Sequence, residues 1–153
     1  MLIEMGKRAK EAASLLNTLG SSKKEEGLKA AARALSDHSS QIEKANEKDM
    51  EKARQNGMSQ GLLDRLALDS KRINAMAEGL LEVAALEDPV GEVLSMKTRP
   101  NGLIIGQKRV PLGVAAIIYE ARPNVTADAF GLCFKSGNAV ILKGGSDALH
   151  SNM

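Results

Sequence analysis

The sequence predicts an α/β protein, in which amphipathic helices precede a β-hairpin and the first βαβ unit of a Rossmann-like parallel sheet. Three observations support this class. Apolar residues recur at helical spacing through residues 1–87, which contain no proline. In residues 88–110, apolar and polar residues alternate on either side of a predicted turn. Residues 111–153 contain two continuous apolar runs that flank a helical stretch. We therefore expect three parts: a helical segment, a linker with a hairpin, and the start of a sheet domain.

The helical segment places apolar residues three and four positions apart, as amphipathic helices do. Such repeats occur at Ala12, Leu15, Leu16 and Leu19, at Leu28, Ala31, Ala32 and Leu35, and at Ile73, Met76, Leu80 and Val83. Gly20 and Gly57 are expected to end helices, because glycine readily adopts the left-handed conformation that follows a last turn. The pattern predicts a bundle of helices and carries no chemistry of its own.

Two signals predict where helices begin. Ser40 is followed three residues later by Glu43, which is a capping-box pattern. Asp69 is expected to cap a helix that begins near Ser70, because its carboxylate can accept a hydrogen bond from a free backbone N–H.

The linker predicts a break and then an antiparallel hairpin. The stretch Asp88–Gly91 interrupts the helical pattern, and the residues after it alternate on both sides of Pro100, Asn101 and Gly102. The hairpin suits either a solvated edge or an arm that contacts another subunit, and the sequence leaves both open.

Residues 111–153 predict one βαβ unit with a right-handed crossover. The runs GVAAIIYE and NAVILKG suit strands covered on both faces. Asn124 or Thr126 is expected to cap the helix between them, and Gly137 to end it. A further helix should begin at Ser146. Because two parallel strands do not form a stable sheet alone, more strands are expected beyond Met153.

The turn after the second apolar run is a candidate ligand site. Lys143 lies at the carboxyl end of that strand, where ligands bind in open parallel sheets. Gly144 and Gly145 allow close approach of the backbone, and Ser146 opens a helix that would favour a phosphate or ribose. A plain glycine turn with a solvated lysine explains the same residues.

The loop after the first apolar run, YEARPNVT, is a second candidate. Arg122 could bind a carboxylate or phosphate through its planar guanidinium. Asn124 could donate from its amide to a developing oxyanion. A loop in which Asn124 merely caps the following helix is the alternative.

Composition argues against other function classes. Net charge is +2, and the 21 basic and 19 acidic residues are interleaved, whereas nucleic-acid binders usually carry a basic stripe. No apolar run is long enough for a signal peptide or a membrane span. The one cysteine, Cys133, allows no internal disulfide and lies among apolar neighbours, where a thiol is usually inert. His38 and His150 stand apart without zinc-site spacing, so no metal is expected.

Residues 109–152, RVPLGVAAIIYEARPNVTADAFGLCFKSGNAVILKGGSDALHSN, resemble the gamma-glutamyl phosphate reductases, a family of the aldehyde dehydrogenase superfamily. The stretch GMSQGLLDRLALDSKRINAMAEGLLEVAALEDPVGEV is also typical of these reductases, so the resemblance covers the whole chain. It implies a cytoplasmic, homo-oligomeric oxidoreductase. Such an enzyme reduces L-glutamate 5-phosphate with NADPH to L-glutamate 5-semialdehyde and phosphate, the second step of L-proline biosynthesis. In the family, a cysteine thiolate attacks the acyl phosphate, and the resulting thioester accepts hydride.

The resemblance also implies roles for single residues. Lys143 matches a lysine that contacts the adenosine ribose or its phosphate, in a cofactor-binding turn that continues through Gly144 and Gly145. Ser146 stands where many members carry an acid that favours NAD, so it is compatible with NADPH. Asn124 matches the asparagine that supports the thioester oxyanion, and Arg122 is a candidate substrate ligand.

The family's catalytic cysteine lies downstream of the matched region, and Cys133 does not share its setting. The chain is therefore expected to be an N-terminal part that is inactive alone, with residues 111–153 as an incomplete NADPH-binding domain. Three alternatives remain: a non-catalytic helical module for oligomerisation or docking, a nucleotide-binding regulatory domain, and a fragment of a general aldehyde dehydrogenase.

Overall fold

Helices fill the first part of the chain in the computed structural model, which describes residues 1–120 and 122–153. They are α1 (Leu2–Leu16), α2 (Ser21–Asp37), α3 (Ser39–Gln55), α4 (Gln60–Leu66) and α5 (Ser70–Ala85). The later elements are β1 (Val93–Thr98), β2 (Ile104–Lys108), β3 (Val114–Ile118), α6 (Asn124–Lys135), β4 (Ala139–Lys143) and the short 3-10 helix η1 (Ser146–Ala148). The predicted α/β class is confirmed, as are the predicted helices, hairpin and βαβ unit.

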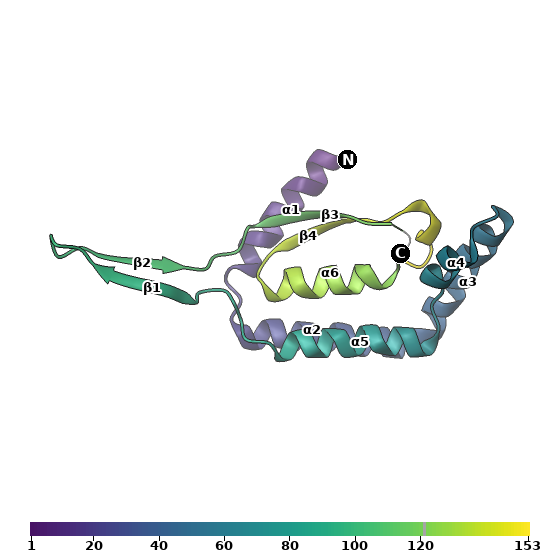
Figure 1. The fold of residues 1–153 in the computed structure, drawn as a ribbon, viewed down its shortest axis with the longest axis horizontal. Helices are drawn as coiled ribbons and strands as arrows, with labels where there is room; N and C mark the ends of the chain where they lie inside the picture. The colour runs from purple at the N-terminus through teal and green to yellow at the C-terminus, as the bar shows by residue number, and fades with distance from the viewer. Residues whose placement is uncertain (121) are drawn as a thin grey trace.

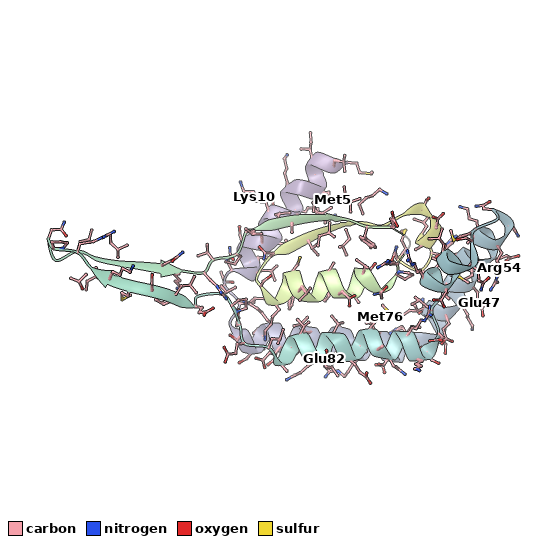
Figure 2. The ribbon with its side chains drawn as sticks, in the orientation of Figure 1. Met5, Lys10, Glu47, Arg54, Met76 and Glu82 are labelled. Atoms are coloured by element: carbon pink, nitrogen blue, oxygen red, sulfur yellow. The ribbon has the colours of Figure 1, made fainter. Side chains whose placement is uncertain are left out.

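Helix α6 lies between the helix pair α2 and α5 and the parallel strands, whereas α1 packs on the strands (Figure 1). Helices α2 and α5 lie side by side on one side of α6, and β3 and β4 lie on the other. The main core joins α2, α5 and α6 through Leu28, Ala32, Ala77, Leu80 and Ala84, with Phe130 and Phe134 of α6 packed against them. Met76 also lies between α5 and α6 (Figure 2). Within the described residues, no helix is long and apolar enough to cross a membrane.

The hairpin β1–β2 extends away from this body (Figure 1). Its strands pair antiparallel, with Thr98 opposite Ile104, and the turn between them contains the predicted Pro100, Asn101 and Gly102. Gly102 has a φ of +84°, the left-handed region in which glycine carries no steric penalty.

The strands β3 and β4 pair parallel, from Val114 opposite Ala139 to Ile118 opposite Lys143. The prediction that both strands are covered on both faces is wrong for β3. Val114 is 37% exposed and Ile118 is 82% exposed. The reason is that α6 and α1 pack mainly on β4, so β3 lies at the outer edge of the pair.

The helix-start predictions had mixed outcomes. The Asp69 cap is confirmed, because the backbone N–H of Arg72 donates to Asp69 Oδ1 at 2.7 Å. The capping box at Ser40 is wrong: α3 begins at Ser39 with His38 as its N-cap. Because His38 alone separates α2 from α3, Ser40 already lies inside the helix and cannot cap it.

The caps of α6 also differ from prediction. Pro123 precedes the helix, and neither Asn124 nor Thr126 caps it. Asn124 Nδ2 donates instead to Asp128 Oδ2 at 3.2 Å. The predicted end at Gly137 is confirmed, with a φ of +75° directly after the last turn.

Two further boundaries complete the comparison. Gly57, with a φ of +71°, follows the end of α3 as predicted. Gly20 was predicted to end a helix, but it has an extended φ of −74° and is the N-cap of α2. The helix predicted from Ser146 is the short 3-10 helix η1.

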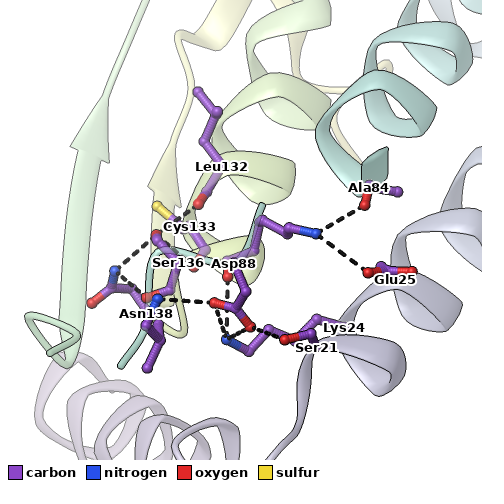
Figure 3. Close-up of polar contacts among 11 residues, drawn as sticks. Ser21, Lys24, Glu25, Ala84, Asp88, Leu132, Cys133, Ser136 and Asn138 are labelled. Atoms are coloured by element: carbon purple, nitrogen blue, oxygen red, sulfur yellow. Dashed lines mark hydrogen bonds and ion pairs between the residues drawn. The ribbon is translucent and has the colours of Figure 1, made fainter. Parts of the chain in front are cut away.

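A buried polar cluster ties the helical segment to the rest of the chain (Figure 3). Lys24, which is 1% exposed, donates from Nζ to both carboxylate oxygens of Asp88 at 2.9 and 2.7 Å, and to the carbonyl of Lys135 at 3.3 Å. Lys135 in turn donates to the carbonyl of Ala84 at 2.8 Å. The two ammonium groups therefore satisfy carbonyls at the C-terminal ends of α6 and α5, which the helices leave without partners.

Glycine at position 131 allows α6 to pack closely on α5. A Cβ on Gly131 would lie 2.6 Å from Leu80 Cδ2. We expect Gly131→Ala to reduce the free energy of unfolding by about 1–3 kcal/mol, because added volume strains a filled core. The matched control is Gly79→Ala on α5, where no atom lies within 4 Å of the new Cβ.

The control variant should be stabilised by about 0.5–1 kcal/mol, because alanine loses less backbone entropy than glycine in a helix. Urea unfolding of both variants measures the difference. Equal stabilisation of the two would show that α5 and α6 are not packed this closely.

Candidate functional site

The two parallel strands bring both predicted ligand loops to one edge of the sheet. The backbone N–H of Tyr119 donates to the carbonyl of Lys143 at 3.1 Å, so the two chains leave β3 and β4 side by side. Arg122 and Asn124 follow β3, and Gly144 to Ser146 follow β4. Ligands of open parallel sheets bind at this carboxyl edge.

Helix α3 holds the segment after η1 through a buried carboxylate. Asp49 is 2% exposed and accepts from the backbone N–H groups of His150 at 3.1 Å and Ser151 at 2.7 Å. The Ser151 hydroxyl also donates to Asp49 Oδ2 at 2.7 Å. Asn46 is equally buried, and its Nδ2 donates to Ser151 Oγ at 3.0 Å and to the Leu66 carbonyl at 2.9 Å.

A small apolar core fixes η1 against α4. Ala148 of η1 is fully buried and packs with Ala53, Leu63 and Leu66. Together with the Asp49 and Asn46 hydrogen bonds, this core sets the turn before η1 at a defined position beside α4. The turn and α4 are far apart in sequence, so the fold alone brings them together.

Gly144 approaches its neighbours too closely for any side chain. A Cβ at this position would lie 2.7 Å from Asn152 Nδ2 and 3.3 Å from the hydroxyl of Tyr119. These neighbours are held in place, because the Tyr119 and Thr126 hydroxyls lie 2.6 Å apart and Thr126 donates to Asn152 Oδ1 at 2.7 Å. Glycine is favoured at this position by the chain's own side chains, and the predicted close approach of a ligand to Gly144 stays a prediction.

Two clefts at this edge share Arg65 and Arg122. One has a volume of about 380 Å³ and is lined by Arg65, Glu120, Arg122, Gly145, Ser146 and Asp147. The other has a volume of about 520 Å³, and its lining includes Arg65, Arg72, Arg122, Asn124 and Asp128. The structure thus places Arg122 between Asn124 and the Gly145–Ser146 turn. Lys143 lines neither cleft; it is exposed, and its Nζ donates to the Gly144 carbonyl at 2.9 Å.

The arginines of the clefts differ in their partners. Arg72 is held by Asp64, whose Oδ1 lies 2.7 Å from the guanidinium, and by the carbonyl of Ala67 at 2.9 Å. Among the described residues, neither Arg65 nor Arg122 has a carboxylate within ion-pair distance of 4 Å. Sequence reasoning missed Arg65, because an exposed arginine on a short helix gives no signal until the fold places it beside Ser146.

Cys133 lies on α6 and is half-buried. Burial raises the pKa of its thiol, because desolvation disfavours the thiolate. We expect the native chain at pH 8 to react with a thiol reagent more slowly than free cysteine, and the urea-unfolded chain to react at the free rate. Equal rates in the native and unfolded chains would contradict the burial of this thiol.

Comparison with known proteins gives one consistent result. No family model matches the chain. It is 60% identical over 152 residues to the gamma-glutamyl phosphate reductase of Lachnospira eligens and 63% identical over 147 residues to that of Moorella thermoacetica, covering 99% and 96% of this chain. It also superposes on the crystal structure of the Thermotoga maritima gamma-glutamyl phosphate reductase with a TM-score of 0.95, 45% identity and 99% of the chain covered. The chain spans 37%, 35% and 36% of the lengths of these three proteins.

Proposed function

Because the chain matches the N-terminal part of the gamma-glutamyl phosphate reductases over 99% of its length, we propose that the protein containing it reduces an acyl phosphate. The substrate is L-glutamate 5-phosphate, and the products are L-glutamate 5-semialdehyde and phosphate, in the route to proline. The observation that supports this most strongly is the identity of 60% or more to two reductases together with the close superposition on a third. The cofactor is NADPH, which supplies the hydride.

Residues of the carboxyl edge take the roles expected for such a reaction. Residues 111–153 form the start of the cofactor-binding domain, and the turn from Gly144 to Ser146 holds the cofactor. At Gly144 the space of a Cβ is filled by Asn152 and Tyr119, so the role proposed for the turn rests on Gly145 and Ser146, which line the smaller cleft. Lys143 contributes through its position at the strand end; its side chain would turn from the Gly144 carbonyl toward the ribose.

Asn124 supports the developing oxyanion. Its amide nitrogen carries two N–H groups, and one of them donates to Asp128 at 3.2 Å. That hydrogen bond orients the amide and leaves the second N–H for the cleft that Asn124 lines. A donor held in this way stabilises charge that develops on an acyl oxygen during attack.

The nucleophile lies outside this chain in the proposed enzyme. Cys133 is the one cysteine in the sequence, and burial raises the pKa of its thiol. A nucleophilic cysteine needs the opposite, a lowered pKa and access to substrate. We therefore infer that the 153 residues alone do not turn over the substrate.

The test is an assay in the reverse direction. The protein from the complete reading frame that contains this chain, and the 153-residue chain itself, are mixed separately with glutamate 5-semialdehyde, NADP and phosphate. We expect phosphate-dependent formation of NADPH with the complete protein only. Turnover of general aldehydes without phosphate, or none at all, would overturn the proposal.

A further inference from the structure

Arg65 and Arg122 are the exposed cationic side chains that line both clefts of the carboxyl edge. They come from α4 and from the loop after β3, which are far apart in sequence. The backbone of Arg65 is held in place, because its neighbours Leu63 and Leu66 pack with Ala148 of η1. The same packing sets the distance between Arg65 and the turn that contains Ser146.

Two guanidinium groups that share a cleft repel each other, and an anion between them relieves the repulsion. Arg72 forms an ion pair with Asp64. Among the described residues, Arg65 and Arg122 have no carboxylate within 4 Å. Glu120 and Asp147 also line the smaller cleft, so it offers hydrogen-bond acceptors as well as cationic donors. This combination suits a ligand that carries both a phosphate and hydroxyl groups.

We infer that Arg65 and Arg122 together bind a phosphate monoester at the cleft beside Ser146, with Arg65 as a specificity-determining residue. This rests on the proposed reductase function. The guanidinium is the side chain best suited to bidentate binding of phosphate. The 2′-phosphate of NADPH is the source that the arrangement favours, because Gly145 and Ser146 line the same cleft and Glu120 and Asp147 can accept from ribose hydroxyls. The phosphate of the substrate is the second source of the same chemistry.

The experiment uses the complete protein with Arg65→Ala and Arg65→Lys. The control is Arg54→Ala, because Arg54 is exposed on α3, as Figure 2 shows, and lines neither cleft. Steady-state rates give KM for NADPH, for NADH and for glutamate 5-phosphate. Calorimetric titration with adenosine 2′,5′-bisphosphate and with 5′-AMP gives their dissociation constants, a second readout that does not depend on turnover.

We expect Arg65→Ala to raise KM for NADPH about 10- to 100-fold and to raise the dissociation constant of the bisphosphate by a similar factor, the usual effect of losing a charge-assisted hydrogen bond. KM for NADH and the dissociation constant of 5′-AMP should change little. Arg65→Lys keeps the positive charge but loses the planar guanidinium that can donate two parallel hydrogen bonds, so its effect should be intermediate. A rise confined to KM for glutamate 5-phosphate would assign the same site to the substrate.

The inference would be overturned if Arg65→Ala left the KM values and the constants for both adenosine phosphates unchanged while the wild type is active. The proposed function would then remain intact. If the wild type itself shows no phosphate-dependent activity, the proposed function fails. If Arg65→Ala folds poorly, Arg65→Lys and Arg122→Lys test the same inference, because each keeps the positive charge and removes only the guanidinium group.

Discussion

Asp88→Ala is expected to lower the free energy of unfolding of this chain by about 3–5 kcal/mol, because it leaves the ammonium group of Lys24 buried without its counter-charge. The Lys24 side chain is 2% exposed and that of Asp88 is 10% exposed. Asp88 also accepts from the Ser21 hydroxyl and the Val90 backbone N–H, both at 3.0 Å. Urea unfolding of wild type and variant measures the change.

The control is Glu92→Ala, which breaks the exposed pair between Glu92 and Arg109, with side chains 50% and 53% exposed. Solvent screens such pairs, so this variant should lose less than about 1 kcal/mol. The double variant Lys24→Met with Asp88→Leu should recover most of the loss, because no buried charge remains. Similar losses in Asp88→Ala and Glu92→Ala would mean that the Lys24–Asp88 pair is not buried.

The same cluster sets the response of stability to acid. Burial alone would raise the pKa of Asp88, but hydrogen bonds from Lys24, Val90 and Ser21 outweigh it and hold the pKa below its usual 3.8. The stabilisation from Asp88 is therefore present above the unfolded-state pKa and is lost as the pH falls through the lower folded-state value. Asp88→Asn should lack this part of the acid dependence.

Asn124→Ala in the complete protein is expected to reduce kcat by about 10²- to 10³-fold, the usual effect of removing one oxyanion donor. KM for NADP should change little, because Asn124 lines the larger cleft and not the one that contains Ser146. Asn74→Ala is the control, since Asn74 is exposed on α5 and lines neither cleft. Steady-state assays in the reverse direction measure both variants. A fall in kcat of less than about threefold would remove Asn124 from the oxyanion site.

Regular elements could be predicted because their signals are local. Helical spacing of apolar residues located the helices, and the Asp69 cap and the Gly57 and Gly137 ends were correct. The predicted bundle is wrong for α1, which packs on β4. The start of α3 could not be predicted from Ser40. His38 is both the C-cap of α2 and the N-cap of α3, so the start of α3 depends on where α2 ends. Capping patterns compete with one another, and the sequence does not rank them.

Burial was harder to predict than secondary structure. The run of apolar residues in β3 suggested two covered faces, yet coverage depends on which neighbours pack on a strand. The charged stretch around Asn46 and Asp49 gave rise to no prediction of burial, whereas both side chains are buried as partners of residues about a hundred positions later. A short polar residue on the same helical face as the buried Ala53 was the one local hint.

The candidate site was predicted in part for the same reason. Gly144 to Ser146, Arg122 and Asn124 could be placed at one edge because parallel strands end together. Arg65 and Asp49 could not, because each acts on residues brought near it only by tertiary packing. The roles of all these residues stay predictions until they are measured.

The most direct measurement replaces the corresponding N-terminal part of the Lachnospira eligens reductase with these 153 residues and follows NADPH formation from glutamate 5-semialdehyde, NADP and phosphate. At 60% identity over 152 residues, the chain should supply the same packing surfaces and the same carboxyl edge. We predict phosphate-dependent turnover within about tenfold of the parent enzyme, lost when Asn124→Ala is added. A folded chimera without turnover, or with turnover that Asn124→Ala leaves unchanged, would contradict the proposed function of this site.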